Sequence, residues 1–285
     1  MNEEKNYPVL TLCQFGKVKR SAYYNWLKHP QSDRERFNLA LAKKIHEIHE
    51  KHPEKGYRGI RDELAVNHQI EVNDKRVLRI CRFEHIQSTI KHSGNSITKP
   101  AIFPYYLAEN ILNREFKSEK PNQKWLTDVT EFKYTVGNDV RKVYLSAILD
   151  LYGRRIVSYV IRDHNDLTIV LDTFQAAIEA EPEAQPLFHS DRGFQYTHKQ
   201  FRTQLVEAGM TQSMSRVGKC IDNGPMEGFW GVLKREKYYT NKFSSREAIV
   251  QMITDFIEYY NNGRLQRSLK VQTPNGYQKT YYDAA

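Results

Sequence analysis

Apolar residues follow a helical period through the first ninety residues. In 33–51 they fall at Phe37, Leu41, Ile45 and Ile48, which predicts an amphipathic helix. Ser32, with Glu35 three positions later, predicts a capping box at its start. A second stripe follows Asn73 and comprises Val77, Leu78, Ile80 and Cys81. Residues 1–91 are therefore expected to form a small all-α region of helix-turn-helix type.

The stretch 8–29 predicts a short pair of helices ahead of that region. Gly16 interrupts the first apolar run, and Ser21 is expected to cap the second helix. Two helices joined by a glycine-containing turn form a DNA-binding pattern. The same pattern is an ordinary way to pack two helices, and for this stretch taken alone we favour ordinary packing.

From residue 124 the period changes to that of strands. Two antiparallel neighbours follow a first strand, and the chain then alternates between helices and short strands. Helix starts are expected at Asp166, at Thr197 with Gln200, at Pro225 and at Ser244 with Glu247. The strands are expected at 124–134, 140–150, 155–162, 187–190 and 212–215. This order predicts an α/β fold, a mixed five-stranded sheet flanked by helices.

Prolines and weak periodicity mark the stretch between the two regions. Residues 92–121 contain Gly94, Pro100, Pro104 and Pro121, so we expect a linker there. The catalytic domain is then expected to occupy 122–285.

The charge of the chain favours a polyanionic partner. The formal net charge is +9, and residues 1–120 hold 22 Lys and Arg against 15 Asp and Glu. Nucleic acid is the first partner to consider, and an acidic membrane surface is the second. On the second helix of the front region, Lys75, Arg76, Arg79 and Arg82 lie opposite the apolar stripe, where they could contact DNA phosphates or simply face solvent.

Nothing in the sequence suggests export or membrane insertion. The start lacks the apolar core of a signal peptide, and no run is long and apolar enough to span a bilayer. Cys13, Cys81 and Cys220 are scattered and form neither a paired metal spacing nor a disulfide framework. A reducing cytoplasm is therefore expected.

Three carboxylates stand in or next to expected strands and helices. Asp128 falls within the first strand, Asp191 just after the fourth, and Glu227 in the first turn after Pro225. Carboxylates from three elements can converge on divalent metal, for which Mg²⁺ is the first choice and Mn²⁺ a substitute. Without metal their charges should raise at least one pKa. Spacing alone does not separate this triple from other acids of the chain: Asp150, Asp163, Asp166, Asp222 and Glu236.

Short sequence motifs around these acids resemble those of a known protein family. The first two are Trp125-Leu126-Thr127-Asp128 and His189-Ser190-Asp191-Arg192-Gly193, and the third is Asp222-Asn223-Gly224-Pro225-Met226-Glu227. With Gly56-Tyr57-Arg58-Gly59-Ile60 in front, they resemble the transposases of the third insertion-sequence family. The match is to the second-frame (OrfB-type) product, and it covers almost the whole chain.

The resemblance implies an RNase-H-like, retroviral-integrase-like DDE core that uses magnesium for DNA cleavage and strand transfer. It assigns Asp128, Asp191 and Glu227 as catalytic and metal-binding acids. Lys234 matches the family's basic residue seven positions after the glutamate, and Gly231 between them is expected to leave room for a close backbone. Phe194 and the triplet 228–230 depart from the family pattern beside the acids.

Other assignments stay open at this point. Arg192, Arg216 and Lys219 could contact phosphate or face solvent, and Asn223 could cap a helix or touch substrate. The partners expected are DNA (element ends and target), the upstream-frame product or a fusion to it, and further copies of this chain on DNA. The alternatives are a DNA-binding regulatory subunit with little catalysis, and an RNase-H-like nuclease.

Overall fold

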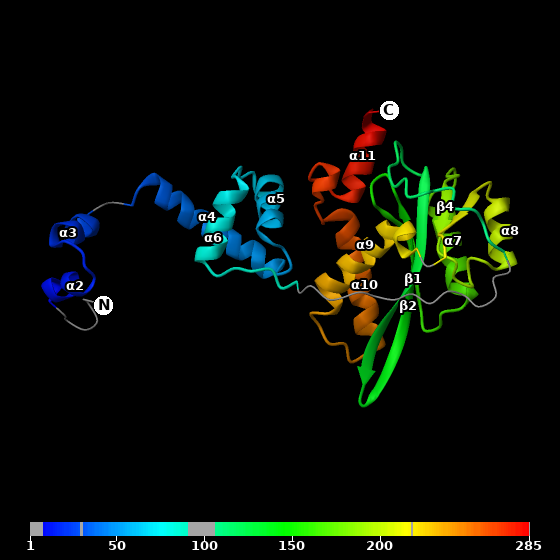
Figure 1. Cartoon of the computed structure of the whole chain (residues 1–285), viewed down its shortest axis with the longest axis horizontal. Helices are drawn as coiled ribbons and strands as arrows, with labels where there is room; N and C mark the ends of the chain where they lie inside the picture. The colour runs from blue at the N-terminus through cyan, green and yellow to red at the C-terminus, as the bar shows by residue number, and fades with distance from the viewer. Residues whose placement is uncertain (1–7, 29–30, 91–105, 218, 285) are drawn as a thin grey trace.

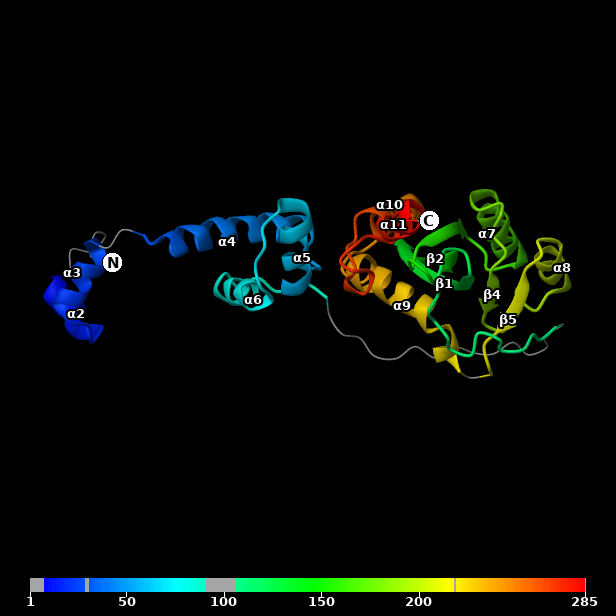
Figure 2. The same cartoon turned by 90° about the horizontal axis from the view of Figure 1, so that it is seen from above.

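The computed structural model describes residues 8–28, 31–90, 106–217 and 219–284. Helices make up the front of the chain, and an α/β domain follows (Figures 1 and 2). The front helices are α2 (Val9–Phe15), α3 (Arg20–Lys28), α4 (Asp33–Lys51), α5 (Tyr57–His68) and α6 (Asp74–Phe83). The sheet consists of β1 (Lys124–Val136), β2 (Asp139–Asp150), β3 (Ile156–Arg162), β4 (Leu187–Ser190) and β5 (Thr211–Met214). The remaining elements are α7 (Leu167–Ala180), α8 (Lys199–Glu207), η1 (Cys220–Asn223), α9 (Gly224–Leu233), the π-helical turn η2 (Lys234–Tyr238), α10 (Arg246–Asn262), η3 (Arg267–Leu269) and α11 (Pro274–Ala284).

Helices α4, α5 and α6 form a bundle with its own core. The capping box of Ser32 and Glu35 is present, and the Asn73 side chain accepts a hydrogen bond from Arg76 N. Both expectations are confirmed. The apolar stripes meet in a cluster in which Ile45, Ile60 and Val77 are fully buried. This bundle is the helical region that the sequence pattern predicted.

The sheet is mixed, with the order β3-β2-β1-β4-β5. Strands β1, β2 and β3 pair antiparallel, whereas β4 pairs parallel with β1 and β5 parallel with β4. Helices α9 and α10 cover one face around Phe229 and Phe256, and α7 and α8 cover the other around Phe174 and Phe201. A five-stranded sheet of this order with helices on both faces is the RNase-H-like arrangement, so the expected fold class is confirmed.

Residues 106–121 belong to the packing of the α/β domain, although we expected 92–121 to be a linker. Ala108 and Leu112 are buried in its two cores, and Leu112 N donates to Ser213 Oγ at 3.1 Å. The segment has no regular secondary structure, and its backbone also bonds to the end of β5, where Met214 N donates to Glu109 O at 3.1 Å. The remainder of that linker up to residue 105 lies outside the described residues.

Three expected helix caps are wrong by one or two positions. Ser21 lies inside α3, which starts at Arg20. His198, not Thr197, caps α8, since its ring accepts from Gln200 N while the Thr197 hydroxyl donates to Phe194 O. Ser245, not Ser244, caps α10. Neighbouring hydroxyl and imidazole groups compete for a cap, and the backbone path decides between them.

Polar contacts join the helical region to the end of the α/β domain. The Arg267 guanidinium donates to both carboxylate oxygens of Asp62, at 2.7 and 3.0 Å, and to Asp74 at 2.9 Å. The His52 ring stacks on Tyr259 with centroids 5.2 Å apart. The contact is polar and aromatic, so it resembles a separable interface more than a shared core.

Candidate active site

Asp128 and Asp191 are brought level by the pairing of β1 with β4. Leu126 pairs with His189 in the parallel register, and each aspartate comes two residues later on its own chain. Adjacent strands lie about 4.8 Å apart and side chains two residues apart share a face. Both carboxylates therefore stand on the face that α9 covers. The expectation that Asp191 follows a strand end is confirmed.

Each aspartate is held by a backbone amide. Val129 N donates to Asp128 Oδ1 at 2.8 Å, and Gly193 N donates to Asp191 Oδ1 at 2.8 Å. A Cβ on residue 193 would lie 2.9 Å from that same oxygen, so only glycine fits this close approach. The turn after β4 therefore fixes one oxygen of Asp191 without a second side chain.

The pKa values of both aspartates are raised. Burial raises the pKa of Asp128 to about 7, and the negative charge of Asp191 adds to the rise. Burial also raises the pKa of Asp191. The expectation that at least one pKa is raised is confirmed, but burial contributes more than the repulsion that we invoked. Burial and the neighbouring charge therefore disfavour the doubly ionised pair.

Helix α9 is joined to β1 by three side-chain hydrogen bonds. Asn223 Nδ2 donates to Thr127 O at 3.0 Å, Trp230 Nε1 to Asp128 Oδ2 at 2.9 Å, and Lys234 Nζ to Thr130 Oγ1 at 2.7 Å. Their acceptors on β1 lie in successive order, so the helix runs along the strand. Of the alternatives for Asn223, capping is excluded, because its side chain makes no cap hydrogen bond.

Glu227 lies in the first turn of α9, between Asn223 and Trp230. Its side chain is exposed, and its charge adds to the rise in the pKa of Asp128. Glu227 therefore faces the same end of the sheet as the two aspartates. Within the described ranges, however, no three His, Cys, Asp or Glu side chains are grouped closely enough to hold an ion as they stand.

The expected role of Gly231 is wrong. A Cβ at this position would meet the guanidinium of Arg235, 3.1 Å from its nearest nitrogen, and not a neighbouring backbone. Lys234, seven positions after Glu227, is half-buried, and its ammonium lies 5.1 Å from the centroid of the Phe132 ring. Burial lowers the pKa of Lys234.

Asp222, one of the alternative acids named from the sequence, is a structural anchor beside the site. It is fully buried and accepts hydrogen bonds from Arg216, from Arg114 at 2.6 Å and from Asn110 at 3.1 Å. These bonds hold the pKa of Asp222 well below its usual range. They anchor η1, immediately before α9, to the irregular segment 106–121. Its adjacency to Asn223 and Glu227 was the only signal in the sequence.

A chain of hydrogen bonds fixes the ends of β4 and β5. His189 is buried, with Nδ1 2.9 Å from Ser213 Oγ and Nε2 3.1 Å from Ser215 Oγ. Ser213 Oγ accepts from Leu112 N and Ser215 Oγ donates to Ser190 O, so the serines require a neutral His189 that donates from Nε2. Burial lowers its pKa to about 4. His189 is therefore a packing residue at the end of β4.

The cations expected to contact DNA differ in how they are engaged. Arg216 forms a fork with Asp222, Arg192 Nε donates to Ser215 O at 2.7 Å, and Arg76 binds Asn38. Lys219 and Arg79 are exposed, and their side chains make no hydrogen bond or ion pair within the described part of the chain. The first three therefore have structural partners, whereas the last two are open to a ligand.

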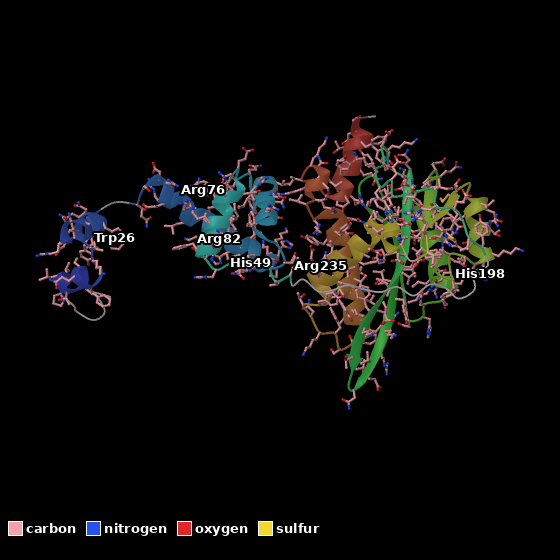
Figure 3. All side chains as sticks on the ribbon, viewed as in Figure 1. Trp26, His49, Arg76, Arg82, His198 and Arg235 are labelled. Atoms are coloured by element: carbon pink, nitrogen blue, oxygen red, sulfur yellow. The ribbon has the colours of Figure 1, made fainter. Side chains whose placement is uncertain are left out.

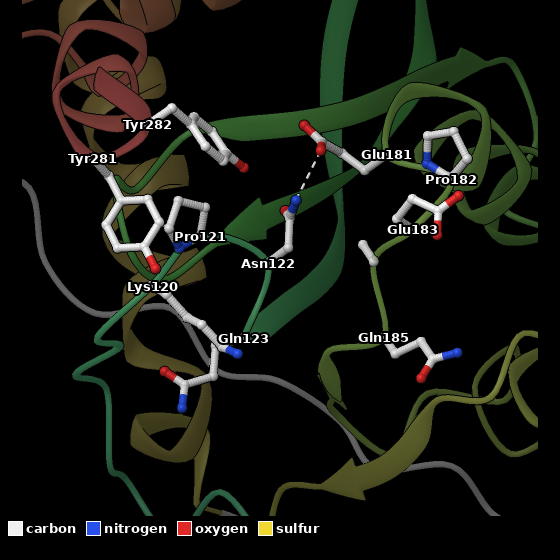
Figure 4. Close-up of a pocket in the computed structure, with 11 residues that line it drawn as sticks. Lys120, Pro121, Asn122, Gln123, Glu181, Pro182, Glu183, Gln185, Tyr281 and Tyr282 are labelled. Carbon is white, nitrogen blue, oxygen red and sulfur yellow. Dashed lines mark hydrogen bonds between the residues drawn. The ribbon is translucent and has the colours of Figure 1, made fainter. Parts of the chain in front are cut away.

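A cavity of about 700 Å³ lies elsewhere (Figure 4). It is bounded by the residues before β1, the loop from α7 to β4 and the end of α11: 120–123, 181–185, Tyr281 and Tyr282. Asp128 lies four residues into β1 and Asp191 directly follows β4, whereas the cavity adjoins residues that precede both strands. The cavity is therefore separate from the carboxylate site.

Comparison with known proteins gives three family matches along the chain. Two matches to families described as integrase core domain cover residues 118–220 and 227–281, and an HTH-like domain matches residues 36–93. Together they span most of the described residues of both regions.

Curated relatives match over nearly the full length. The chain is 34% identical over 97% of its length to a protein described as transposase InsK for insertion sequence element IS150 of Escherichia coli, of which it covers 95%. It is 32% identical to an IS600 protein of Shigella sonnei, with coverage of 96% and 100%, respectively. It is 25% identical to transposase InsF for IS3A of Escherichia coli, with coverage of 92% and 90%.

Solved structures also resemble the chain. A simian T-cell lymphotropic virus intasome matches with a TM-score of 0.49 at 14% identity, covering 76% of this chain and 74% of that one. The catalytic core of HTLV-2 integrase in complex with magnesium matches with a TM-score of 0.45 at 17% identity, covering 57% and 99%.

Proposed function

The chain belongs to the IS3-family transposases of insertion sequences, with an integrase core and an HTH-like domain, and we propose that it cleaves and joins DNA strands with Asp128, Asp191 and Glu227 as catalytic acids. The observation that carries the proposal is the level placement of Asp128 and Asp191 on adjacent strands, with α9 fastened to the same strand. The first step is hydrolysis of a phosphodiester at the element end, and the second is attack of the freed 3′-hydroxyl on target DNA.

The three carboxylates fit a divalent cation. Their donor set is oxygen only, which suits Mg²⁺, with Mn²⁺ as a substitute. The raised pKa of Asp128, caused mainly by burial, indicates that its carboxylate form would be favoured by a bound cation. When bound, the metal would lower the pKa of the attacking oxygen and stabilise the leaving one. Because Glu227 is exposed at the start of α9, its side chain has to rotate towards the aspartates to complete the set.

Residues around the acids keep their carboxylates oriented. Trp230 and the amide of Val129 each hold one oxygen of Asp128, and Gly193 N holds one oxygen of Asp191. Lys234 lies near Asp128, whose charge favours the ammonium form against the effect of burial. It is placed to meet a phosphate oxygen once DNA enters.

Exposed cations supply the DNA contacts in this proposal. Arg79 and Arg82 project from α6 of the HTH-like domain, with Arg82 labelled in Figure 3, and Lys219 precedes the helix that carries Glu227. Arg76, Arg192 and Arg216 would act mainly by shaping these surfaces. Two element ends must be held together for joining, so further copies of the chain, and the upstream-frame product, are the protein partners we propose.

The test is strand transfer with labelled terminal DNA and magnesium. Asp191→Asn and Glu227→Gln, with folding confirmed by circular dichroism, should each lower the yield of joined product by several powers of ten. Cleaved but never joined product from the parent chain would support an RNase-H-like nuclease. Equal activity of parent and variants would refute the catalytic assignment. DNA binding without any cleavage, even with the upstream-frame product present, would support a regulatory subunit.

A further inference from the structure

Helices α2 and α3 lack a core of their own. Cys13 is their only buried residue among 8–28, and α3 has none. Phe15 is 92% exposed, and Trp26, labelled in Figure 3, is 73% exposed. Helices of seven and nine residues are marginal by themselves, so this pair needs a surface to bind.

The charge of α2 and α3 indicates what kind of surface they bind. Residues 8–28 include Lys17, Lys19, Arg20 and Lys28 and no Asp or Glu. The recorded hydrogen bonds of this stretch are backbone bonds within it, and no ion pair engages its cations in the part of the chain described. In the α/β domain, by contrast, Arg216 and Arg264 are held by the buried acids Asp222 and Glu236. The cations of α2 and α3 are therefore available to a polyanion.

The turn gathers three of these cations. Gly16 and Lys17 end α2, and Lys17 has a left-handed backbone with φ of 52°. Lys17, Lys19 and Arg20 border a cleft of about 350 Å³ between the helices, whose floor includes Leu10 and Cys13. Arg20 is the first residue of α3, where the free amides of the helix add positive potential.

We propose that α2 and α3 form a second DNA-binding element that grips the phosphate backbone of duplex DNA through Lys17, Lys19 and Arg20. It lies outside residues 36–93, which match the HTH-like domain. Two helices with cations at the start of the second are suited to a duplex, because that end can approach a groove while its neighbour crosses the backbone. The inference rests on the proposed function for the identity of the DNA, but not for binding itself.

The experiment measures DNA binding by the full chain in EDTA, which removes divalent metal and so prevents metal-dependent cleavage. Fluorescence anisotropy with a labelled duplex is recorded over a series of KCl concentrations. The variant is Lys17→Gln/Lys19→Gln/Arg20→Gln, and the control is Arg141→Gln/Lys199→Gln/Lys279→Gln, which removes the same charge from exposed positions of the α/β domain. Loss of three phosphate contacts should reduce the magnitude of the negative slope of log affinity against log salt by about 2.7 in the variant. The slope of the control should stay unchanged.

A charge-preserving variant guards against misfolding. Lys17→Arg/Lys19→Arg/Arg20→Lys should keep the parent slope. DNA should also quench tryptophan fluorescence in the parent, and Trp26→Phe should remove most of that quenching. An unchanged slope in the glutamine variant would overturn the proposal, as would an effect confined to single-stranded DNA. If the glutamine variant keeps the parent slope but loses self-association in sedimentation, the proposal is overturned, and α2 and α3 instead form an interface between copies of the chain.

These outcomes are independent of catalysis. Strand transfer by the same proteins is measured separately in magnesium, with Asp191→Asn as the inactive reference. A chain that binds through α2 and α3 but never joins DNA would refute the proposed function and leave this inference standing.

Discussion

The indole of Trp230 donates a 2.9 Å hydrogen bond from Nε1 to Oδ2 of Asp128, across the boundary between helix α9 and strand β1. Trp230 is three residues after Glu227, so one helical turn connects the hydrogen bond to the exposed acid. The bond holds one oxygen of Asp128 and fixes how α9 presents Glu227 to the two aspartates.

Trp230→Phe should therefore weaken metal binding. Phenylalanine keeps most of the buried ring but removes the donor that favours ionised Asp128, so its pKa should rise further. We expect metal affinity and strand transfer to fall about 10- to 100-fold, as for other partners of metal ligands. The measurement is a Mn²⁺ titration followed by thermal stabilisation. Trp125→Phe is the matched control, because Trp125 is also buried and donates to Asn122 at the start of β1, away from the acids.

Asn223→Ala should separate positioning from stability. It removes the 3.0 Å bond to Thr127 O, and we expect a loss of about 1–3 kcal/mol in the free energy of unfolding. Asn261→Ala removes two bonds between α10 and the backbone of Ile156, both at 3.0 Å, and should cost at least as much. Only Asn223→Ala should lower the rate of strand transfer at saturating DNA, by tenfold or more. Equal rates in the two variants would contradict a role in placing Glu227.

Asp222→Asn should destabilise the α/β domain. The variant leaves Arg216 and Arg114 beside a buried amide, and breaking such a pair costs about 3 kcal/mol. Since the folded state lowers the pKa of Asp222, its contribution is present above the unfolded pKa near 4 and is lost as pH falls further. Urea unfolding should show a large difference between parent and variant at pH 7 and a smaller one at pH 3.

The raised pKa of Asp128 predicts an opposite pH dependence for the metal-free chain. The folded pKa is about 7 and the unfolded one near 4, so the folded state binds more protons between these values. This contribution to stability is therefore full at pH 4 and is lost as pH rises through 7. Asp128→Asn should raise the melting temperature at pH 8 much more than at pH 5. His189, whose pKa is about 4, acts in the other sense, but is common to both proteins.

Arg267→Ala should loosen the helical region from the α/β domain. It removes the bonds to buried Asp62 and to partly exposed Asp74. Since the Arg267 side chain is itself partly exposed, we expect a loss of only about 1 kcal/mol in stability. The change should therefore be visible in shape more than in melting temperature, as a larger radius of gyration in X-ray scattering. Arg267→Lys, which keeps the charge, should restore part of the compact form. An unchanged radius in Arg267→Ala would show that the stacking of His52 on Tyr259 suffices.

The sequence by itself determined the elements and indicated the family. Strand and helix periods located every strand of the sheet within a few residues, and the words around Asp128, Asp191 and Glu227 indicated the family that the relatives confirm. Local patterns succeed here because burial of one face and proline at a helix start are encoded within a few neighbouring residues.

Only the tertiary structure decided which side chains meet. The bonds of Asn223 to Thr127 and of Trp230 to Asp128 join residues about a hundred positions apart, and nothing in either stretch specifies them. The pKa of Asp128 is likewise set mainly by burial, which depends on how α9 packs over the sheet. Local periodicity fixes which face of an element is apolar, whereas hydrogen-bond partners and desolvation depend on the packing of elements distant in the chain.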